Sequence, residues 1–151
     1  MSVITAAGGK SVYRGYEYFR SCRVRSLNRT AETLLRAEVS GSNGAVYQTM
    51  VDVVHPLKSK CDCPHAAGRR IVCKHMVAVY FTAFPEEAAN YIRELEAYEE
   101  EAESQQAELE DAVVRYVDGL KKSELQETLL QVLFDGPQWQ FDRFAREHLD
   151  Y

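Results

Sequence analysis

The chain has 151 residues with a formal net charge of −5, and 46% of its residues are hydrophobic while 27% are charged. This composition is typical of a soluble globular protein and excludes collagen-like and low-complexity chains. No apolar run approaches the roughly 20 residues that a membrane-spanning helix needs, so we expect no membrane partner. The N-terminal sequence MSVITAAGGK lacks the basic and apolar regions of a secretory signal, which favours a reducing, cytoplasmic location where thiols stay free or bind metal.

The charge is divided unevenly along the chain. Residues 1–80 contain 12 Lys/Arg and 5 Asp/Glu, a formal charge of +7, whereas residues 81–151 contain 6 and 18, a formal charge of −12. Such asymmetry indicates two segments with different partners. We therefore predict two domains, residues 1–84 and residues 85–151, with the boundary near Phe84 and Pro85.

The first domain begins with a tyrosine-rich stretch and continues with alternating patterns. Residues 11–19 (SVYRGYEYF) fit a short helix or an extended segment, and periodicity does not decide between them. Residues 22–27, 34–40 and 45–54 alternate apolar and polar side chains, as half-buried strands do. The GSNG sequence at residues 41–44 favours a hairpin turn. We predict an α+β domain with a small three-stranded antiparallel sheet.

The side chains of the first predicted strand are assigned to two faces. Cys22 is alone on that strand, so we expect it in the core beside Val24. Arg23 and Arg25 then share the outward face of the sheet with Arg36, which makes this face basic.

Three of the four cysteines gather in KCDCPHAAGRRIVCKHM, residues 60–76. Two residues apart on an extended segment, Cys61 and Cys63 share one side of the backbone. Cys73 opens a helical pattern that Pro85 stops, so its thiol and the His75 imidazole lie at the helix N-terminus. Three thiolates and one imidazole make a tetrahedral Cys₃His site, the closed arrangement of one structural Zn²⁺.

Two alternatives to this zinc site stay open from the residues alone. His65 is a reserve ligand that replaces His75 if the loop folds back, and the cysteines are otherwise small core residues. A site with four protein ligands has no open position for water, which argues against an enzyme at this metal.

The two pairs CDC and CKH, at Cys61–Cys63 and Cys73–His75, resemble the C-x-C, variable gap, C-x-H motif of SWIM-type zinc finger proteins. RGYEYF, VSGS and VYQTMVDV, which begin at residues 14, 39 and 46, are also similar to bacterial members. The resemblance covers roughly residues 10–84. It implies a ββα-like zinc core with a role in DNA binding or protein interaction, and bacterial relatives are associated with helicase-type partners.

Basic residues surround the predicted zinc site and could contact phosphates. The candidate nucleic-acid-binding residues are Arg23, Arg25 and Arg36 on the sheet, and Lys58, Lys60, Arg69, Arg70 and Lys74 around the metal. Tyr13, Tyr16 and Tyr18 could stack on unpaired bases. The alternative is that the arginines only solvate a surface and the tyrosines fill the core, and the acidic charge of the whole chain supports it.

The second domain is predicted to be entirely helical. From Glu86 onward, apolar residues recur at spacings close to a heptad repeat, but Glu99 and Gln106 interrupt the repeat. The pattern therefore does not predict a long stable coiled coil. Ser123 and Gln126 form a capping-box pattern at the start of a further helix, and Gly136-Pro137 ends it. The apolar faces of these helices need a cover, so we expect a bundle, closure over the zinc module, or an interface. Because the last residues are still amphipathic, we expect the front part of a longer protein or one subunit of an assembly.

Two functions follow. The first is a zinc-stabilised module that binds nucleic acid through its basic half and recruits a protein partner through its acidic helices. The second is a protein-interaction adaptor without nucleic-acid contact. No Ser/His/Asp constellation or phosphate-cradling glycine loop is present, so we expect neither an enzyme nor a small-molecule substrate.

Overall fold

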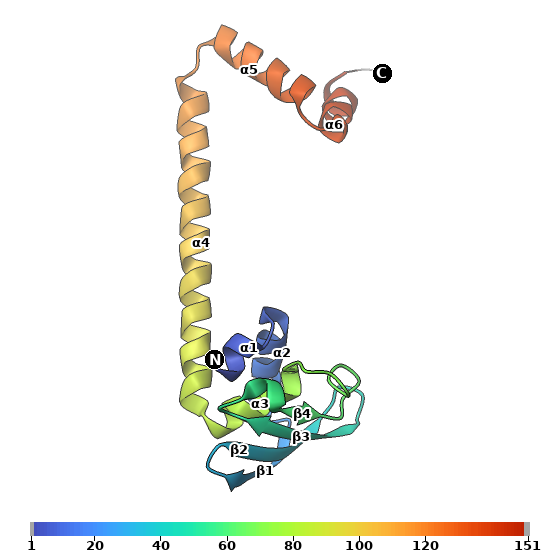
Figure 1. Cartoon of the computed structure of the whole chain (residues 1–151). Coiled ribbons are helices and arrows are strands. Elements are labelled where there is room, and N and C mark those ends of the chain that lie inside the picture. Colours follow the sequence, from blue (N-terminus) through green and yellow to red (C-terminus); the bar gives the residue numbers. More distant parts are fainter. Residues whose placement is uncertain (1, 150–151) are drawn as a thin grey trace. The chain divides into compact units, whose positions relative to one another are not determined.

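The computed structural model describes residues 2–149. These residues form two compact units, the first ending at Glu96 and the second beginning at Ala97. The first unit contains the short helix α1 (Val3–Ala6), helices α2 (Gly9–Arg20) and α3 (Lys74–Ala83), and a four-stranded sheet (Figure 1). Helix α4 (Pro85–Gly119) begins in the first unit and continues into the second.

The sheet is an antiparallel meander in the order β1 (Val24–Ala31), β2 (Leu34–Ser40), β3 (Val46–Asp52) and β4 (Lys60–Cys61). The α+β class and the three longer strands agree with the sequence prediction, but the prediction of three strands is wrong because it omits β4. With two residues, β4 is too short to show alternation, and only its pairing with Thr49 and Met50 of β3 defines it. The turn between β2 and β3 places Gly44 at a φ of 81°, as the GSNG sequence predicts.

Cys22 does not lie in a strand, so its assignment to the core is wrong. It is exposed between α2 and β1, with a φ of 50°. The first strand also has a register shift between Val24 and Ser26, and Asn28, not Arg25, pairs with Arg36. The pairing therefore does not place Arg25 beside Arg36, as the expected basic face requires. A two-residue period cannot show a bulge, because one irregular residue moves the following side chains to the other face.

The tyrosine-rich stretch forms helix α2, which settles the alternative that periodicity left open. Tyr16 is half-buried, and its ring centroid lies 6.1 Å from that of Phe81 and 5.8 Å from that of Tyr91. Tyr18 is buried against His75, whereas Tyr13 is half exposed. Of the three tyrosines considered for base stacking, Tyr18 is thus a core residue and Tyr16 packs against the core.

Helix α3 is the centre of the first unit. It packs against the sheet on one side and against α2 on another, and every residue from His75 to Phe81 is buried. A helix that is apolar all round needs such a buried position. It meets α2 at Gly15, where an added Cβ would lie 2.5 Å from Cβ of Val77 and 2.9 Å from the Lys74 carbonyl oxygen.

The first turns of α4 belong to the core of the first unit, because Ala88 is buried in it and Tyr91 packs against it. The predicted boundary at residues 84/85 coincides with the junction of α3 and α4. That residues 1–84 and residues 85–151 fold as separate domains stays a prediction.

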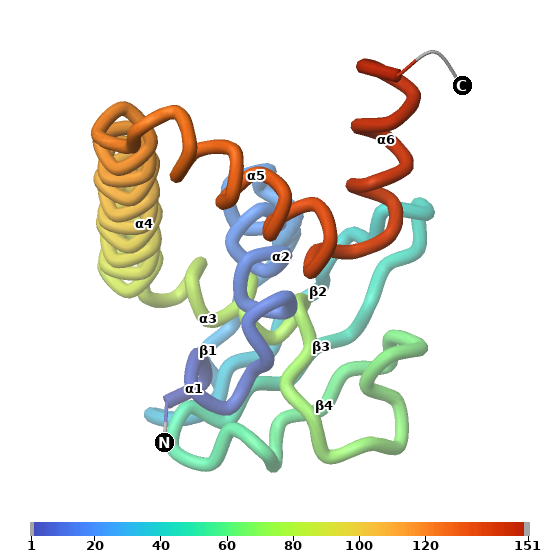
Figure 2. Tube along the Cα trace, turned by 90° about the horizontal axis from the view of Figure 1, so that it is seen from above, coloured from blue at the N-terminus to red at the C-terminus, as the bar shows by residue number. Residues whose placement is uncertain are grey.

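The second unit contains the rest of α4 together with α5 (Lys122–Asp135) and α6 (Gln138–His148). Helix α6 turns away from the direction of α5 after Gly136 and Pro137, as predicted (Figure 2). The predicted cap at Ser123 is wrong: α5 begins at Lys122, and the backbone N–H of Lys121 donates to the Glu124 carboxylate at 2.7 Å. Of the described residues of this unit, only Leu133 is buried. Within residues 2–149, none of the helices combines the length and apolar character needed to span a membrane.

Candidate metal centre

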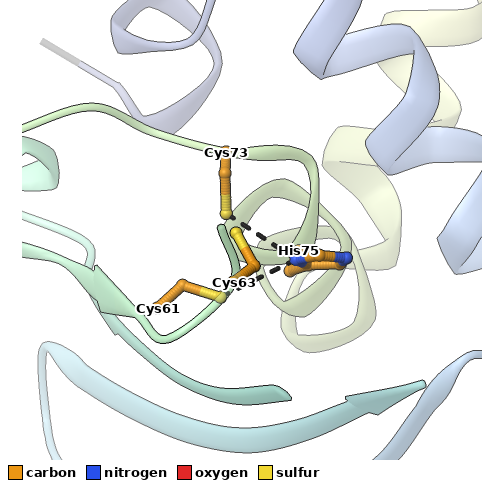
Figure 3. A group of neighbouring side chains, drawn as sticks. All are labelled: Cys61, Cys63, Cys73 and His75. Atoms are coloured by element: carbon orange, nitrogen blue, oxygen red, sulfur yellow. Dashed lines mark hydrogen bonds between the residues drawn. The ribbon is translucent and has the colours of Figure 1, made fainter. Parts of the chain in front are cut away.

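Four side chains converge where the sheet edge meets the start of α3. Cys61 comes from β4, Cys63 follows it, Cys73 is the N-cap residue of α3, and His75 lies in the first turn of that helix. Their three sulfur atoms and one imidazole nitrogen all lie within 4.8 Å of one another, and Figure 3 shows the four side chains together. Nδ1 of His75 is 3.7 Å from Sγ of Cys61 and 4.0 Å from Sγ of Cys73.

Local backbone structure explains this convergence. The pairing of Cys61 with Thr49 fixes the first thiol at the edge of the sheet. The carbonyl of Cys63 accepts hydrogen bonds from the N–H groups of Ala66 and Ala67 at 3.0 and 2.9 Å, which turns the chain back. Cys73 has extended backbone angles (φ −92°, ψ 168°), so its thiol can face the site although it is only two residues from His75.

The geometry fits a tetrahedral zinc ion. Bond lengths of about 2.3 Å to sulfur and 2.0 Å to nitrogen require neighbouring ligand atoms about 3.5–3.8 Å apart, and the observed separations need only small adjustments. All four residues are buried, and the cysteines are free thiols. Three buried sulfurs and one buried imidazole nitrogen are the donor set of a structural zinc site.

The family comparison points to the same metal. Residues 40–84 match the sequence model of the SWIM zinc finger. The chain carries a SWIM zinc finger. Its Cys₃His cluster is consistent with one structural zinc ion. Residues 1–39 and 85–151 lie outside the match, and neither a search of curated proteins nor one of solved structures finds a protein that matches the chain.

The thiols of the SWIM finger do not ionise independently. Burial and the nearby Cys61 thiolate raise the pKa of Cys63. The pKa of Cys73 is also raised, first because its thiol donates to the Cys61 sulfur and then by burial. Hydrogen bonding from Cys73, with further contributions from His75 and Thr49, lowers the pKa of Cys61 against the opposing effect of burial. Without a cation, the site therefore favours one thiolate and two thiols.

Zinc binding should consequently release about two protons at neutral pH, because Cys63 and Cys73 must become thiolates. The zinc-bound state holds fewer protons than the free state, so acidification favours the free state. Below the raised pKa values of Cys63 and Cys73, the zinc affinity should fall by about a hundredfold for each unit of pH. Calorimetric titration with zinc at pH 7 in two buffers of different ionisation enthalpy measures the release. A binding enthalpy independent of the buffer would contradict it.

Three residues that support the site were not singled out as such from the sequence. Oγ1 of Thr49 lies 3.3 Å from Sγ of Cys61, and the rings of Tyr47 and Tyr18 pack on His75 with centroids 4.7 and 5.3 Å away. The alternation of Tyr47, Thr49 and Val51 along β3 was the available signal, since it places these side chains on one face. Contacts of this kind orient metal ligands.

The two remaining candidates near the site are not part of it. His65 is exposed and lies outside the group of four ligands, so the structure favours His75. Cys22 also lies outside this group.

The eight candidate nucleic-acid-binding residues are distributed over separate surfaces. Five of them line a groove of about 1080 Å³ beside β4, here called the basic groove: Arg36, Lys58, Lys60, Arg69 and Arg70. Arg23 and Lys74 lie over the ring of Tyr18, 4.9 and 4.4 Å from its centroid. Burial alone would raise the pKa of Tyr18, but Lys74, Ser42 and Arg23 lower it below its ordinary value. Arg25 is exposed, does not line this groove, and is not among the cations that lie over the Tyr18 ring.

Proposed function

We propose that the chain is a zinc-stabilised binding module that contacts the phosphate backbone of nucleic acid through its basic groove. The observation that carries this proposal is the gathering of five exposed cations around one groove. Phosphate contacts by such side chains supply most of the affinity of non-specific nucleic-acid binding.

The cations of the groove are free to meet a ligand. The ion pairs among residues 2–149 join Glu17 with Arg20 and Glu147 with Arg143, and neither involves the groove. Asp62 contributes a carboxylate to the groove lining, but this group accepts the backbone N–H of Gln48 at 3.0 Å. The groove thus keeps a net positive charge that suits a polyanion.

Zinc supports this function by holding the groove together. Cys61 lines the groove between Lys60 and the loop that carries Arg69 and Arg70, and the metal ties both segments to α3. Four protein ligands leave no coordination position for water. We therefore propose binding and not catalysis, in the cytoplasm, where thiols stay reduced.

The test is fluorescence anisotropy with single- and double-stranded DNA at several salt concentrations. Five phosphate contacts on duplex DNA should give a slope of log K against log salt of about −4.5, and the double variant Arg69→Gln/Arg70→Gln should reduce its magnitude by about 1.8. The control is Arg20→Gln/Arg25→Gln, which removes the same charge outside the groove. Absent or salt-insensitive binding, or equal losses in both variants, would contradict the proposal.

A protein-interaction adaptor is the second candidate, and the apolar surface of the second unit favours it. Large side chains on α5 and α6 are exposed, with Phe134 at 68% and Trp139 at 63%. Surfaces of this kind bury themselves against a partner. A protein partner, of the helicase type that the family resemblance implies, would bind these helices. If DNA binding fails while the zinc site is intact, the adaptor function remains.

A further inference from the structure

A second cavity lies on another side of the zinc site and shares no residue with the basic groove. Its volume is about 500 Å³, within the range of small-ligand sites. Its walls come from α2, the turn between β2 and β3, the loop that follows Cys63, and the first turn of α3. Lys10, Arg14 and Lys74 line it together with the zinc ligands Cys63, Cys73 and His75, and its described lining contains no Asp or Glu. We call it the α2–α3 cavity.

Two buried polar atoms belong to residues that line this cavity. Tyr18 and His75 are 8% and 3% exposed. Neither Oη of Tyr18 nor Nε2 of His75 has a hydrogen-bond partner within 3.5 Å among residues 2–149, although Lys74 and Ser42 lie near enough to Tyr18 to lower its pKa. Buried polar groups without partners are rare in folded proteins because each costs about 1–3 kcal/mol. Two of them in the wall of one cavity indicate that something else supplies their partner.

The zinc site determines what that partner must be. Nδ1 of His75 faces the sulfurs, and the second ring nitrogen lies on the far side of the imidazole from them (Figure 3). A histidine that binds zinc through Nδ1 carries its proton on Nε2, and ligating histidines donate this N–H to an acceptor. Tyr18 adds a hydroxyl donor. The cavity is therefore lined by two residues that carry buried donors, by three cations, and by the zinc ligands Cys63 and Cys73.

We propose that the α2–α3 cavity binds a phosphate group, either free or carried by a small molecule of mononucleotide size. A phosphate offers several acceptor oxygens and a double negative charge, which matches the three cations and the two buried donors. Lys74 adds to this match because it begins α3, whose N-terminus favours anions. The ligand is bound without chemical change. This inference does not depend on nucleic-acid binding in the basic groove.

The test is calorimetric titration of the full, zinc-loaded chain with inorganic phosphate and, separately, with adenosine monophosphate. We expect saturable one-site binding. The variant Lys10→Gln/Arg14→Gln, which changes two exposed residues of the cavity, should weaken it about tenfold or more. The control Arg20→Gln/Arg25→Gln removes the same charge outside the cavity and should keep the affinity. Tighter binding of the nucleotide identifies a larger ligand, and equal affinities identify phosphate alone; both support the proposal.

Tyr18→Phe separates binding from folding. It removes only the unpartnered hydroxyl, so the zinc content should stay the same and the melting temperature should stay the same or rise. Phosphate affinity should fall several-fold, and phosphate should shift the ¹⁵N resonance of Nε2 in the wild-type protein. No saturable binding of either titrant below about 10 mM, or equal affinity of the cavity and control variants, would overturn the proposal.

Discussion

Replacement of Cys63 by serine is expected to release the zinc ion and to unfold residues 55–84. A hydroxyl is a poor zinc ligand at neutral pH, and loss of the ion leaves Cys61 and Cys73 buried without their cation. In small zinc fingers, metal binding supplies about 10–16 kcal/mol of apparent folding free energy. The first unit also has an apolar core around Leu35, Val39 and Phe81. We therefore expect the free energy of unfolding to fall by only part of this amount, but by more than about 4 kcal/mol.

The measurements are zinc content per chain and thermal unfolding, with removal of zinc by a chelator as an independent route to the same state. Cys22→Ser is the matched control, because Cys22 is exposed and lies outside the ligand group. It should retain one zinc and change stability by less than about 0.5 kcal/mol. Wild-type metal content and melting in Cys63→Ser would show that these residues do not hold the ion.

Gly15→Ala is expected to destabilise the first unit by about 2 kcal/mol or more. Alanine favours a helix over glycine by about 1 kcal/mol, so on its own the exchange would stabilise α2. The added methyl, however, would meet Cβ of Val77 and the carbonyl of Lys74. Neither atom can move by a change of rotamer, so α2 and α3 must separate, and overpacking of this kind costs about 1–3 kcal/mol or more.

Thermal unfolding measures this effect, and the melting temperature of a unit of this size should fall by about 10 °C. Gly9→Ala is the control in the same helix, since an added Cβ there has no atom within 4 Å. That exchange should be neutral or stabilise by up to about 1 kcal/mol. Similar melting of the two variants would mean that the helices do not approach at Gly15.

The zinc ligands and the longer strands could be predicted because their signals are local. The spacing of Cys61, Cys63, Cys73 and His75 limits which metal they can hold. The GSNG turn lies between two stretches in which apolar and polar side chains alternate. By contrast, β4 exists only through its pairing with Thr49 and Met50, and Cys22 is excluded from β1 by a left-handed backbone angle. Neither tertiary pairing nor a single unusual φ has a counterpart in side-chain periodicity.

The distribution of the basic residues could not be predicted either. Their number is evident from the sequence, but the bulge in β1 and the path of the loop between Cys63 and Cys73 decide which of them become neighbours. Arg36 and Arg69 thus line one groove while Lys74 lines the α2–α3 cavity. Likewise, the burial of Tyr18 on His75 depends on the packing of α2 against α3.

Helix α3 is enclosed on every side from His75 to Phe81 and also provides a zinc ligand in its first turn. Helix α3 is therefore both the centre of the apolar core and a helix that the zinc ion holds in place. A cell that produces this chain faster than it delivers zinc would accumulate polypeptide with its most hydrophobic segment uncovered. The yield of usable protein then reports on metal supply, and recombinant production depends on the trace-element content of the growth medium.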